Sequence, residues 1–169
     1  MVPVVVALGS NVGDSLSYLR QATQVLGGVL SNLKVSPIYR TAPMYVQDQP
    51  PFLNAAVSGT YAEGPLQLLQ KLKKIEAEIG RQTRARYGPR EIDLDLVAFG
   101  SLSYLGPRLQ VPHPRTPERR FVLLPMFDLD PNLRLATMGT VAELLAQTQP
   151  QAEDVVPIED ALFPIPGHR

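Results

Sequence analysis

Residues 80–99, GRQTRARYGPREIDLDLVAF, decide the fold, because an arginine-rich loop there runs directly into an apolar segment with two aspartates. Residues 92–97 have the composition of a β-strand, in which every second side chain points to the same face. Asp93 and Asp95 therefore share one face, on what we expect to be a central strand. Aspartate is depleted in strands and like charges on one face repel, so a cation should lie beside them.

The loop before this strand contains four arginines and no acidic residue between positions 80 and 90: Arg81, Arg84, Arg86 and Arg90. Guanidinium groups match phosphate oxygens, and Mg²⁺ binds carboxylates at sites that substrate phosphates complete. The stretch predicts a polyphosphate site. The alternative is a solvated strand face, or aspartates that only form ion pairs with the neighbouring arginines.

The composition limits the class of protein. The chain has 169 residues, 44% of them apolar, with a formal net charge of zero and no cysteine. This predicts one domain over residues 1–169, without disulfides or thiolate metal sites, and without global attraction to nucleic acid or membranes. The apolar N-terminal run is too short to span a membrane and lacks a basic leader, so we expect a cytoplasmic monomer.

The elements around the arginine loop follow a recognisable order. Helical spacing of leucine and isoleucine from Pro65 predicts a helix that Gly80 ends, and residues 52–61 alternate as a strand. Upstream, residues 3–8 and 30–39 predict strands that flank a helix with Asp14 at its N-cap. Strand, helix, strand, strand, helix, strand is the ferredoxin-like βαββαβ arrangement, an α+β class with an antiparallel sheet and helices packed on it.

Smaller elements follow as C-terminal additions. A hairpin is expected over residues 102–109, and residues 117–127 are expected to be partly helical, with Pro125 kinking or ending that helix. Thr140 and Glu143 form a capping box for a last helix, and residues 155–158 could add a strand. The loops over residues 40–51 and 80–90 are long for this domain, and we expect both to act as lids over a substrate.

Other residues have chemistry that suits a ligand. His113 lies between prolines with arginines nearby, so it is either a structural histidine or a contact to an anion. Asn54 shares a strand face with Phe52, and a buried amide needs partners that a flat heterocycle could supply. The sequence contains no P-loop and no protein-kinase signature, so a nucleotide would have to be held differently.

Several motifs together resemble one family. They are GSN at 9–11, YRTAP at 39–43, QDQP at 47–50, FLNAAV at 52–57, RYGPREIDLD at 86–95 and VPHPR at 111–115. In this order they are similar to 6-hydroxymethyl-7,8-dihydropterin pyrophosphokinase, a folate-synthesis family that transfers pyrophosphate from ATP to the pterin hydroxymethyl group. The resemblance extends to about residue 135 and implies the ferredoxin-like fold.

The resemblance also implies roles for individual residues. Asp93 and Asp95 match carboxylates that hold two Mg²⁺ ions, and either Arg84 or Arg86 matches a catalytic loop arginine. The positions that match nucleotide contacts are Glu76, Arg81, Arg90, Ile92, Arg108, His113 and Arg119, of which Arg81 and Arg90 are also catalytic. The positions that match the pterin site are Thr41, Ala42, Met44, Phe52, Asn54 and Phe121.

Two other functions are compatible with the residues alone. A metal-dependent phosphohydrolase would use the same carboxylates and arginines without a pterin. A ferredoxin-like nucleic-acid-binding module would use the sheet face, but zero net charge and the lack of an aromatic RNA-binding motif disfavour it. The proposed partners are therefore ATP and the hydroxymethyl pterin.

Overall fold

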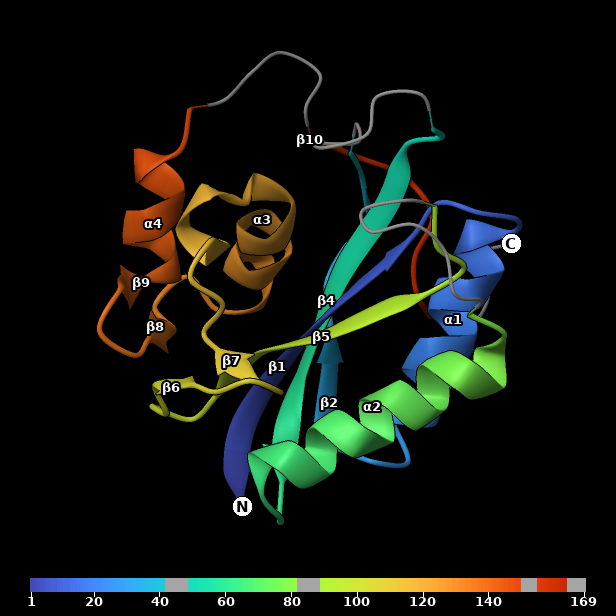
Figure 1. Ribbon diagram of the computed structural model, residues 1–169. Helices are drawn as coiled ribbons and strands as arrows, with labels where there is room; N and C mark the ends of the chain where they lie inside the picture. The colour runs from blue at the N-terminus through green and yellow to red at the C-terminus, as the bar shows by residue number, and fades with distance from the viewer. Residues whose placement is uncertain (42–48, 82–88, 150–154, 164–169) are drawn as a thin grey trace.

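The computed structural model describes residues 1–41, 49–81, 89–149 and 155–163, whose framework is a six-stranded antiparallel sheet (Figure 1). The strand order is β10-β3-β4-β1-β5, and β2 also pairs with β4. These strands are β1 Val2–Ser10, β2 Ser31–Val35, β3 Tyr39–Thr41, β4 Phe52–Tyr61, β5 Asp93–Phe99 and β10 Val155–Pro157. The sheet and its helices confirm the predicted ferredoxin-like α+β fold.

Strand β1 lies in the middle of the sheet, between β4 and β5, as its apolar run predicts. The prediction that the aspartate strand is also central was wrong, because β5 is the last strand in the sheet order and pairs only with β1 in the described chain. Its apolar residues are buried because both its faces are covered. Leu94 and Leu96 belong to one core and Val97 and Ala98 to the other. The apolar composition of β5 therefore indicated that both its faces are covered, and it did not indicate how many strands lie beside it.

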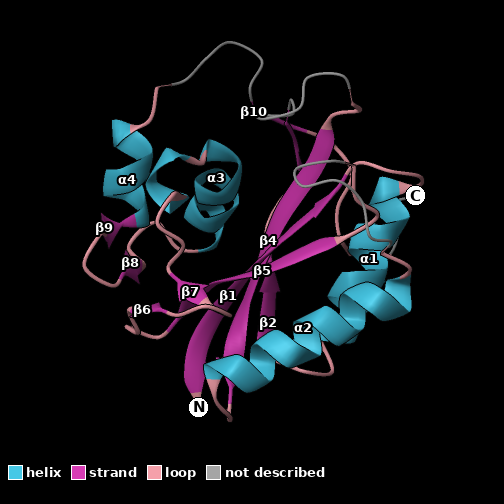
Figure 2. Ribbon diagram, in the orientation of Figure 1, coloured by secondary structure: helices cyan, strands magenta, loops and turns pink. Residues whose placement is uncertain are grey.

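Helices cover both faces of the sheet (Figure 2). Helices α1 Ser15–Leu26 and α2 Pro65–Ile79 pack on one face over a core that includes Val4, Val6 and Leu8. Helices α3 Arg120–Leu129 and α4 Val141–Gln147 pack on the other face, over a smaller core. Among the described residues, no helix combines the length and the apolar character needed to cross a membrane.

The predicted ends of the first two helices are confirmed. The Asp14 carboxylate accepts a hydrogen bond of 3.1 Å from the Ser17 N–H at the start of α1, and Gly27 follows its last residue. Gly80 ends α2 with a φ of 118°, a left-handed conformation that favours glycine. The turn at Gly80 directs the following Arg81 toward β5.

Two elements differ from the predictions made for them. The strand expected over residues 30–39 is divided into β2 and β3, because Ser36 interrupts the ladder: its hydroxyl accepts from the Ala56 N–H at 2.8 Å. Helix α3 does not end at Pro125 but continues to Leu129. Proline removes only one N–H donor, and Val122, Leu123 and Met126 hold this helix on the sheet through their buried side chains.

The segments after β5 are short. The predicted hairpin is formed by β6 Tyr104–Leu105 and β7 Gln110–Val111, and a 3-10 turn, Thr116–Glu118, precedes α3. A second hairpin, β8 Arg134–Leu135 with β9 Gly139–Thr140, was not predicted. The capping box is confirmed, since the Thr140 hydroxyl accepts from the Glu143 N–H at 3.1 Å and starts α4.

The C-terminal segment packs on the domain. Strand β10 pairs with β3 along its whole length, so the added strand is confirmed. Leu162 is only 1% exposed in the main core, and the Arg20 guanidinium donates to the Ala161 carbonyl at 2.9 Å. The tail therefore supports β3, the strand that ends at Thr41.

A glycine on β4 tests how closely the β2 segment must approach the sheet. A Cβ added at Gly59 would lie 2.8 Å from the Ser31 carbonyl oxygen and 2.9 Å from the Leu30 Cβ. We expect Gly59→Ala to lower the free energy of unfolding by about 1–3 kcal/mol, because backbone must move to relieve the overlap. Chemical denaturation measures the effect. Gly28→Ala is the control, since a Cβ there would meet only the Val25 carbonyl oxygen, at an ordinary contact distance of 3.5 Å, and equal stability loss in both variants would contradict the explanation.

Candidate active site

The sheet register places the candidate residues in two rows that cross three strands. In the first row Gly9 of β1 pairs with Asn54 of β4 on one side and with Asp93 of β5 on the other. In the second row Ala7 pairs with Ala56 and Asp95. Strands are about 4.8 Å apart, so Asn54 and the aspartates lie roughly 10 Å from each other across a floor of small side chains.

Gly9 leaves the space that the Asn54 amide occupies. A Cβ at position 9 would lie 3.0 Å from the Asn54 Nδ2 and 3.6 Å from the Phe52 Cδ1. Any larger residue would push the amide away from the sheet. The glycine of the GSN motif is therefore explained by side-chain space on the sheet face.

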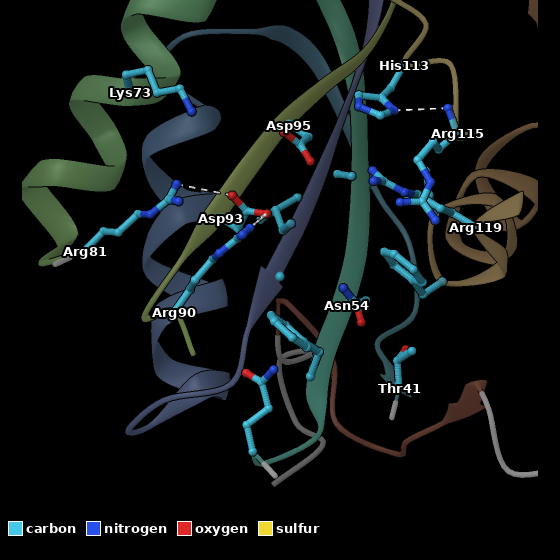
Figure 3. A pocket seen from close by; sticks show the side chains of 17 residues that line it. Thr41, Asn54, Lys73, Arg81, Arg90, Asp93, Asp95, His113, Arg115 and Arg119 are labelled. Atoms are coloured by element: carbon cyan, nitrogen blue, oxygen red, sulfur yellow. Dashed lines mark hydrogen bonds and ion pairs between the residues drawn. The ribbon is translucent and has the colours of Figure 1, made fainter. Parts of the chain in front are cut away.

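A cavity of about 640 Å³ lies over this floor (Figure 3). One part of its wall is charged, and the other part carries aromatic and uncharged polar side chains. A second cavity, of about 260 Å³, adjoins it and is lined by apolar residues of α2 and β5 and by the β6–β7 hairpin with Arg108. Both cavities share Lys73, Asp95, His113, Arg119 and Val122, so the two cavities adjoin along a common wall.

The two aspartates point into the first cavity but differ in their partners. Asp93 forms ion pairs with Arg81 at 3.2 Å and with Arg90 at 2.9 Å, so the ion-pair alternative describes Asp93 in this state. Asp95 forms no ion pair within the described part of the chain. Although solvent reaches its side chain, surrounding protein atoms raise the pKa of Asp95 to about 6, and the Asp93 charge adds to the shift.

Glu76 connects α2 to the aspartate strand. Its carboxylate is almost fully buried and accepts hydrogen bonds from the Leu94 N–H at 2.7 Å and from the Arg81 Nη1 at 2.8 Å. Burial raises the pKa of Glu76 despite these donors. The same guanidinium nitrogen of Arg81 also contacts Asp93, so Glu76 holds Arg81 against the carboxylate that lines the cavity.

His113 and Arg119 face the cavities from the α3 side. The His113 Nδ1 accepts from the Arg115 N–H at 3.1 Å, so in the neutral ring the proton is on Nε2, which is a donor. Burial and the charges of Arg119 and Arg115 lower the pKa of His113 and keep the ring neutral. The Nε of Arg119 is buried and has no hydrogen-bond partner among the described residues, and an anion would supply one.

The uncharged part of the wall has two unpartnered acceptors. Within the described part of the chain, the Oδ1 of Asn54 and the Oγ1 of Thr41 are buried without hydrogen-bond partners, and both residues line the cavity with Phe52 and Phe121. Gln49 also lines this wall, and its Oε1 accepts from Asn11 at 2.9 Å. Aromatic rings beside free carbonyl and hydroxyl oxygens suit a flat ligand with N–H donors.

The predicted site residues divide into four groups. Most line the first cavity: Thr41, Phe52, Asn54, Arg81, Arg90, Asp93, Asp95, His113, Arg119 and Phe121. Arg108 lines only the second cavity, whereas Glu76 and Ile92 line neither, and Ile92 is fully buried in the core. Ala42, Met44, Arg84 and Arg86, with most of both predicted lids, lie outside the described residues.

Sequence reasoning missed Lys73 and Gly9 as lining residues. Lys73 precedes Glu76 by three positions, so it lies on the same side of α2, and this spacing was a signal that could have revealed it. Gly9 gave no signal of its own, because its importance depends on the register that pairs it with Asn54 and Asp93.

Among the residues that the structure describes, the two aspartates are the candidate ligands for a metal ion at this wall. Within the described residues, no group of three or more acidic, histidine or cysteine side chains could hold a metal. Mg²⁺ commonly binds through one or two carboxylates together with substrate phosphates and water. Two carboxylates on one strand face, beside arginines, fit an ion of that type.

These features define a ferredoxin-like domain whose sheet face carries a cavity suited to a polyanionic substrate with a flat ring. Comparison with known families is in agreement. The model of the 7,8-dihydro-6-hydroxymethylpterin-pyrophosphokinase (HPPK) family matches residues 5–131, and the chain belongs to this family.

Curated relatives include stand-alone and longer proteins. The 2-amino-4-hydroxy-6-hydroxymethyldihydropteridine pyrophosphokinase of Bacillus subtilis is 44% identical over 126 residues, 73% of this chain and 75% of the relative. That of Pseudomonas aeruginosa is 40% identical over 145 residues, 85% of this chain and 90% of the relative. The mitochondrial folate synthesis bifunctional protein of Arabidopsis thaliana is 46% identical over 128 residues, but the chain spans only 23% of its length.

Among solved structures, wild-type HPPK-DHPS of Plasmodium falciparum is similar with a TM-score of 0.68. The match covers 86% of this chain and 44% of that chain, at 15% sequence identity. This likeness supports the fold alone.

The Glu76 connection gives a prediction about stability. Glu76→Ala leaves the Leu94 N–H buried without an acceptor, so we expect a loss of about 2–3 kcal/mol in the free energy of unfolding. Glu76→Gln keeps an acceptor, so its free energy of unfolding should stay within about 1 kcal/mol of that of the parent. Thermal unfolding of both variants measures the difference.

The sign of the pH dependence provides a control. The folded-state pKa of Glu76 is raised, so its stability contribution is complete below the unfolded pKa and is lost as pH rises through the folded pKa. Glu76→Gln has no such titration, and its Tm should therefore improve relative to the parent as pH rises above the unfolded glutamate pKa of about 4.3. A relative decline over this range would contradict the raised pKa.

Proposed function

We propose that this chain transfers the pyrophosphoryl group of ATP to the hydroxyl of 6-hydroxymethyl-7,8-dihydropterin, forming AMP and the pterin diphosphate in folate synthesis. The observation that carries the proposal is the row of Asn54, Gly9 and Asp93 across the sheet. This row joins two parts of one cavity wall: the aromatic and uncharged polar part, which suits a heterocycle, and the charged part, which suits phosphates. Two strand spacings of roughly 5 Å each separate the two parts. Membership of the family and the names of its curated relatives support the same reaction.

The ring of the pterin would occupy the aromatic part of the cavity. The unpartnered oxygens of Asn54 and Thr41 can accept from its N–H groups, and Phe52 and Phe121 offer ring faces. Ala42 and Met44 remain predicted pterin contacts. The hydroxymethyl group would then point along the floor over Gly9 toward Asp93, where the phosphates are expected.

ATP would fill the charged part of the first cavity and the adjoining second cavity. The second cavity, with Leu69, Leu96, Leu109 and Arg108 in its wall, suits a nucleoside, and its contact with the first cavity allows the triphosphate to reach the charged wall. Arg81 and Arg90 would exchange one carboxylate partner for phosphate oxygens, and the neutral His113 would donate from Nε2. Ile92 and Glu76 would act only indirectly on the nucleotide.

The reaction requires position and charge compensation more than a covalent intermediate. The pterin hydroxyl oxygen forms a bond to the β-phosphorus, the bond between that phosphorus and the oxygen on the α-phosphorus breaks, and AMP leaves. Asp93 and Asp95 would hold Mg²⁺, which we propose as two ions and which supplies positive charge to the phosphates. The arginines hold the phosphates in place, and a closed cavity keeps out water, which would otherwise compete with the hydroxyl.

The first alternative is a phosphohydrolase, which would release phosphate without a pterin, and the second is a nucleic-acid-binding module. The discriminating experiment mixes the protein with ATP, Mg²⁺ and the hydroxymethyl pterin and measures AMP. The proposal requires AMP only when the pterin is present. AMP or phosphate formed equally without it would support the hydrolase, and no turnover with affinity for RNA would support the binding module.

The state of the protein in the cell belongs to the same proposal. We propose a cytoplasmic monomer whose small-molecule partners are ATP and the pterin, without a membrane or nucleic-acid partner. The absence of cysteine is compatible with a reducing compartment. Two plant relatives are named as mitochondrial proteins, so relatives within the family occupy different compartments.

Asp95 tests the carboxylate assignment. Asp95→Ala should reduce pterin-dependent AMP formation at least about 1,000-fold, because Mg²⁺ loses one of two carboxylates. Because burial raises the folded pKa of Asp95 to about 6, its ionisation costs stability as pH rises from the unfolded pKa to that value, so the variant should not lose stability at pH 8. Steady-state kinetics and thermal unfolding measure both effects. Glu78→Ala on the exposed side of α2 is the control, and near-normal turnover of Asp95→Ala would contradict the metal assignment.

Gly9 tests the pterin wall. In Gly9→Ala the new methyl group would lie 3.0 Å from the Asn54 Nδ2 and displace the amide. We expect the KM for the pterin to rise by about 10-fold or more, because one displaced hydrogen bond costs about 1–2 kcal/mol, while the KM for ATP changes little. Kinetics with each substrate varied in turn measure the two values. An increase confined to the KM for ATP would contradict the proposed position of the pterin.

A further inference from the structure

Lys73 stands where the two cavities meet. Five of the described residues line both cavities, and Lys73 is the one lysine among these five; the others are Asp95, His113, Arg119 and Val122. A ligand that fills both cavities must pass between these side chains. The family resemblance gave roles to His113, Arg119 and Asp95 but none to Lys73.

The Lys73 ammonium is available to a ligand. Its Nζ lies 3.5 Å from the Glu76 Oε1, and the side chain remains 57% exposed. Glu76 already accepts from the Leu94 N–H and from Arg81 through its other oxygen, so its position does not depend on the lysine. In Figure 3 the Lys73 side chain extends from α2 toward the strand that carries Asp95.

We propose that Lys73 binds the α-phosphate of ATP and stabilises the negative charge that develops on AMP as it leaves. This inference rests on the proposed function, in which the nucleoside occupies the second cavity and the transferred phosphates lie beside Asp93. The phosphate between these two parts of ATP is the α-phosphate. It must lie at the wall that the cavities share, where Lys73 is the flexible cation on the α2 side.

The chemistry explains why a cation is needed at this position. When the bond between the β-phosphorus and the bridging oxygen breaks, its electron pair stays on the oxygen that remains attached to the α-phosphorus. The hydroxyl proton of the pterin is released to solvent, so the AMP phosphate becomes more negative than it was within ATP. An ammonium group beside that oxygen binds the transition state and the product more strongly than the substrate, and it therefore raises kcat.

A purely structural lysine would behave differently. If Lys73 only neutralised Glu76, then Lys73→Gln would change the Tm and would weaken the binding of AMP and of adenosine to the same extent. A phosphate contact affects AMP alone, because adenosine has the same ring and ribose but no phosphate. The comparison of these two ligands therefore separates the two roles.

The experiment compares Lys73→Gln, Lys73→Arg and Lys74→Gln in the full chain. Lys74 is the matched control, since it is the next residue of α2, is 77% exposed and lies 3.9 Å from Glu78 on the outside of the helix. We expect Lys73→Gln to weaken AMP binding about 10-fold or more in calorimetry, as expected for one lost charge-assisted hydrogen bond, with adenosine unchanged. The kcat should fall by a similar factor with little change in the KM for the pterin, Lys73→Arg should recover part of both losses, and Lys74→Gln should resemble the parent.

The outcomes separate this inference from the proposed function. If the parent forms AMP only with the pterin but Lys73→Gln binds AMP and turns over normally, the role of Lys73 is overturned and the function stands. If the parent shows no pterin-dependent AMP, the function fails, and calorimetry with AMP and adenosine still decides whether Lys73 contacts the phosphate. Equal weakening of both ligands with a lower Tm would overturn the inference in favour of the structural role.

Discussion

The antiparallel register of β1 between β4 and β5 is the constraint on which the site depends. Backbone hydrogen bonds fix Gly9 opposite both Asn54 and Asp93, and Ala7 opposite Asp95. Because side chains alternate along a strand, this register alone brings the amide and both carboxylates to the same face. A shift by one residue would turn all of them toward α1 and α2, into the main apolar core.

The uneven cover of the sheet leaves this face open where it is needed. Helices α3 and α4 pack over Val5, Ala56 and Val97 and bury one end of the face, while Gly9 at the other end lines the cavity. On the opposite face, Glu76 joins α2 to β5 through the Leu94 N–H and also holds Arg81. A buried carboxylate thus connects the core to the charged wall of the cavity, where a rigid set of donors is useful for phosphate chemistry.

The sequence predicted the order and type of the main elements well because periodicity and end signals are local. Asp14 and Gly80 marked helix ends, and the bounds of β4 agreed with the alternation of residues 52–61. It failed where distant contacts decide. Ser36 divides a predicted strand because its hydroxyl accepts a hydrogen bond from the Ala56 N–H. Helix α3 continues past Pro125 because its buried side chains pack on the sheet. The position of β5 at the sheet edge was also misjudged, because burial by helices leaves the same apolar pattern as burial between strands.

By itself the sequence determined the fold class, the aspartate pair and most side chains that line the cavity, because these follow from local patterns and from motifs of a known family. Only the tertiary structure decided how they are combined. It paired Asp93 with two arginines, placed Ile92 in the core, gave Glu76 a supporting position and added Gly9 and Lys73 to the wall. The physical reason is that register, crossover and helix packing set distances between residues far apart in the chain, and no local pattern contains those distances.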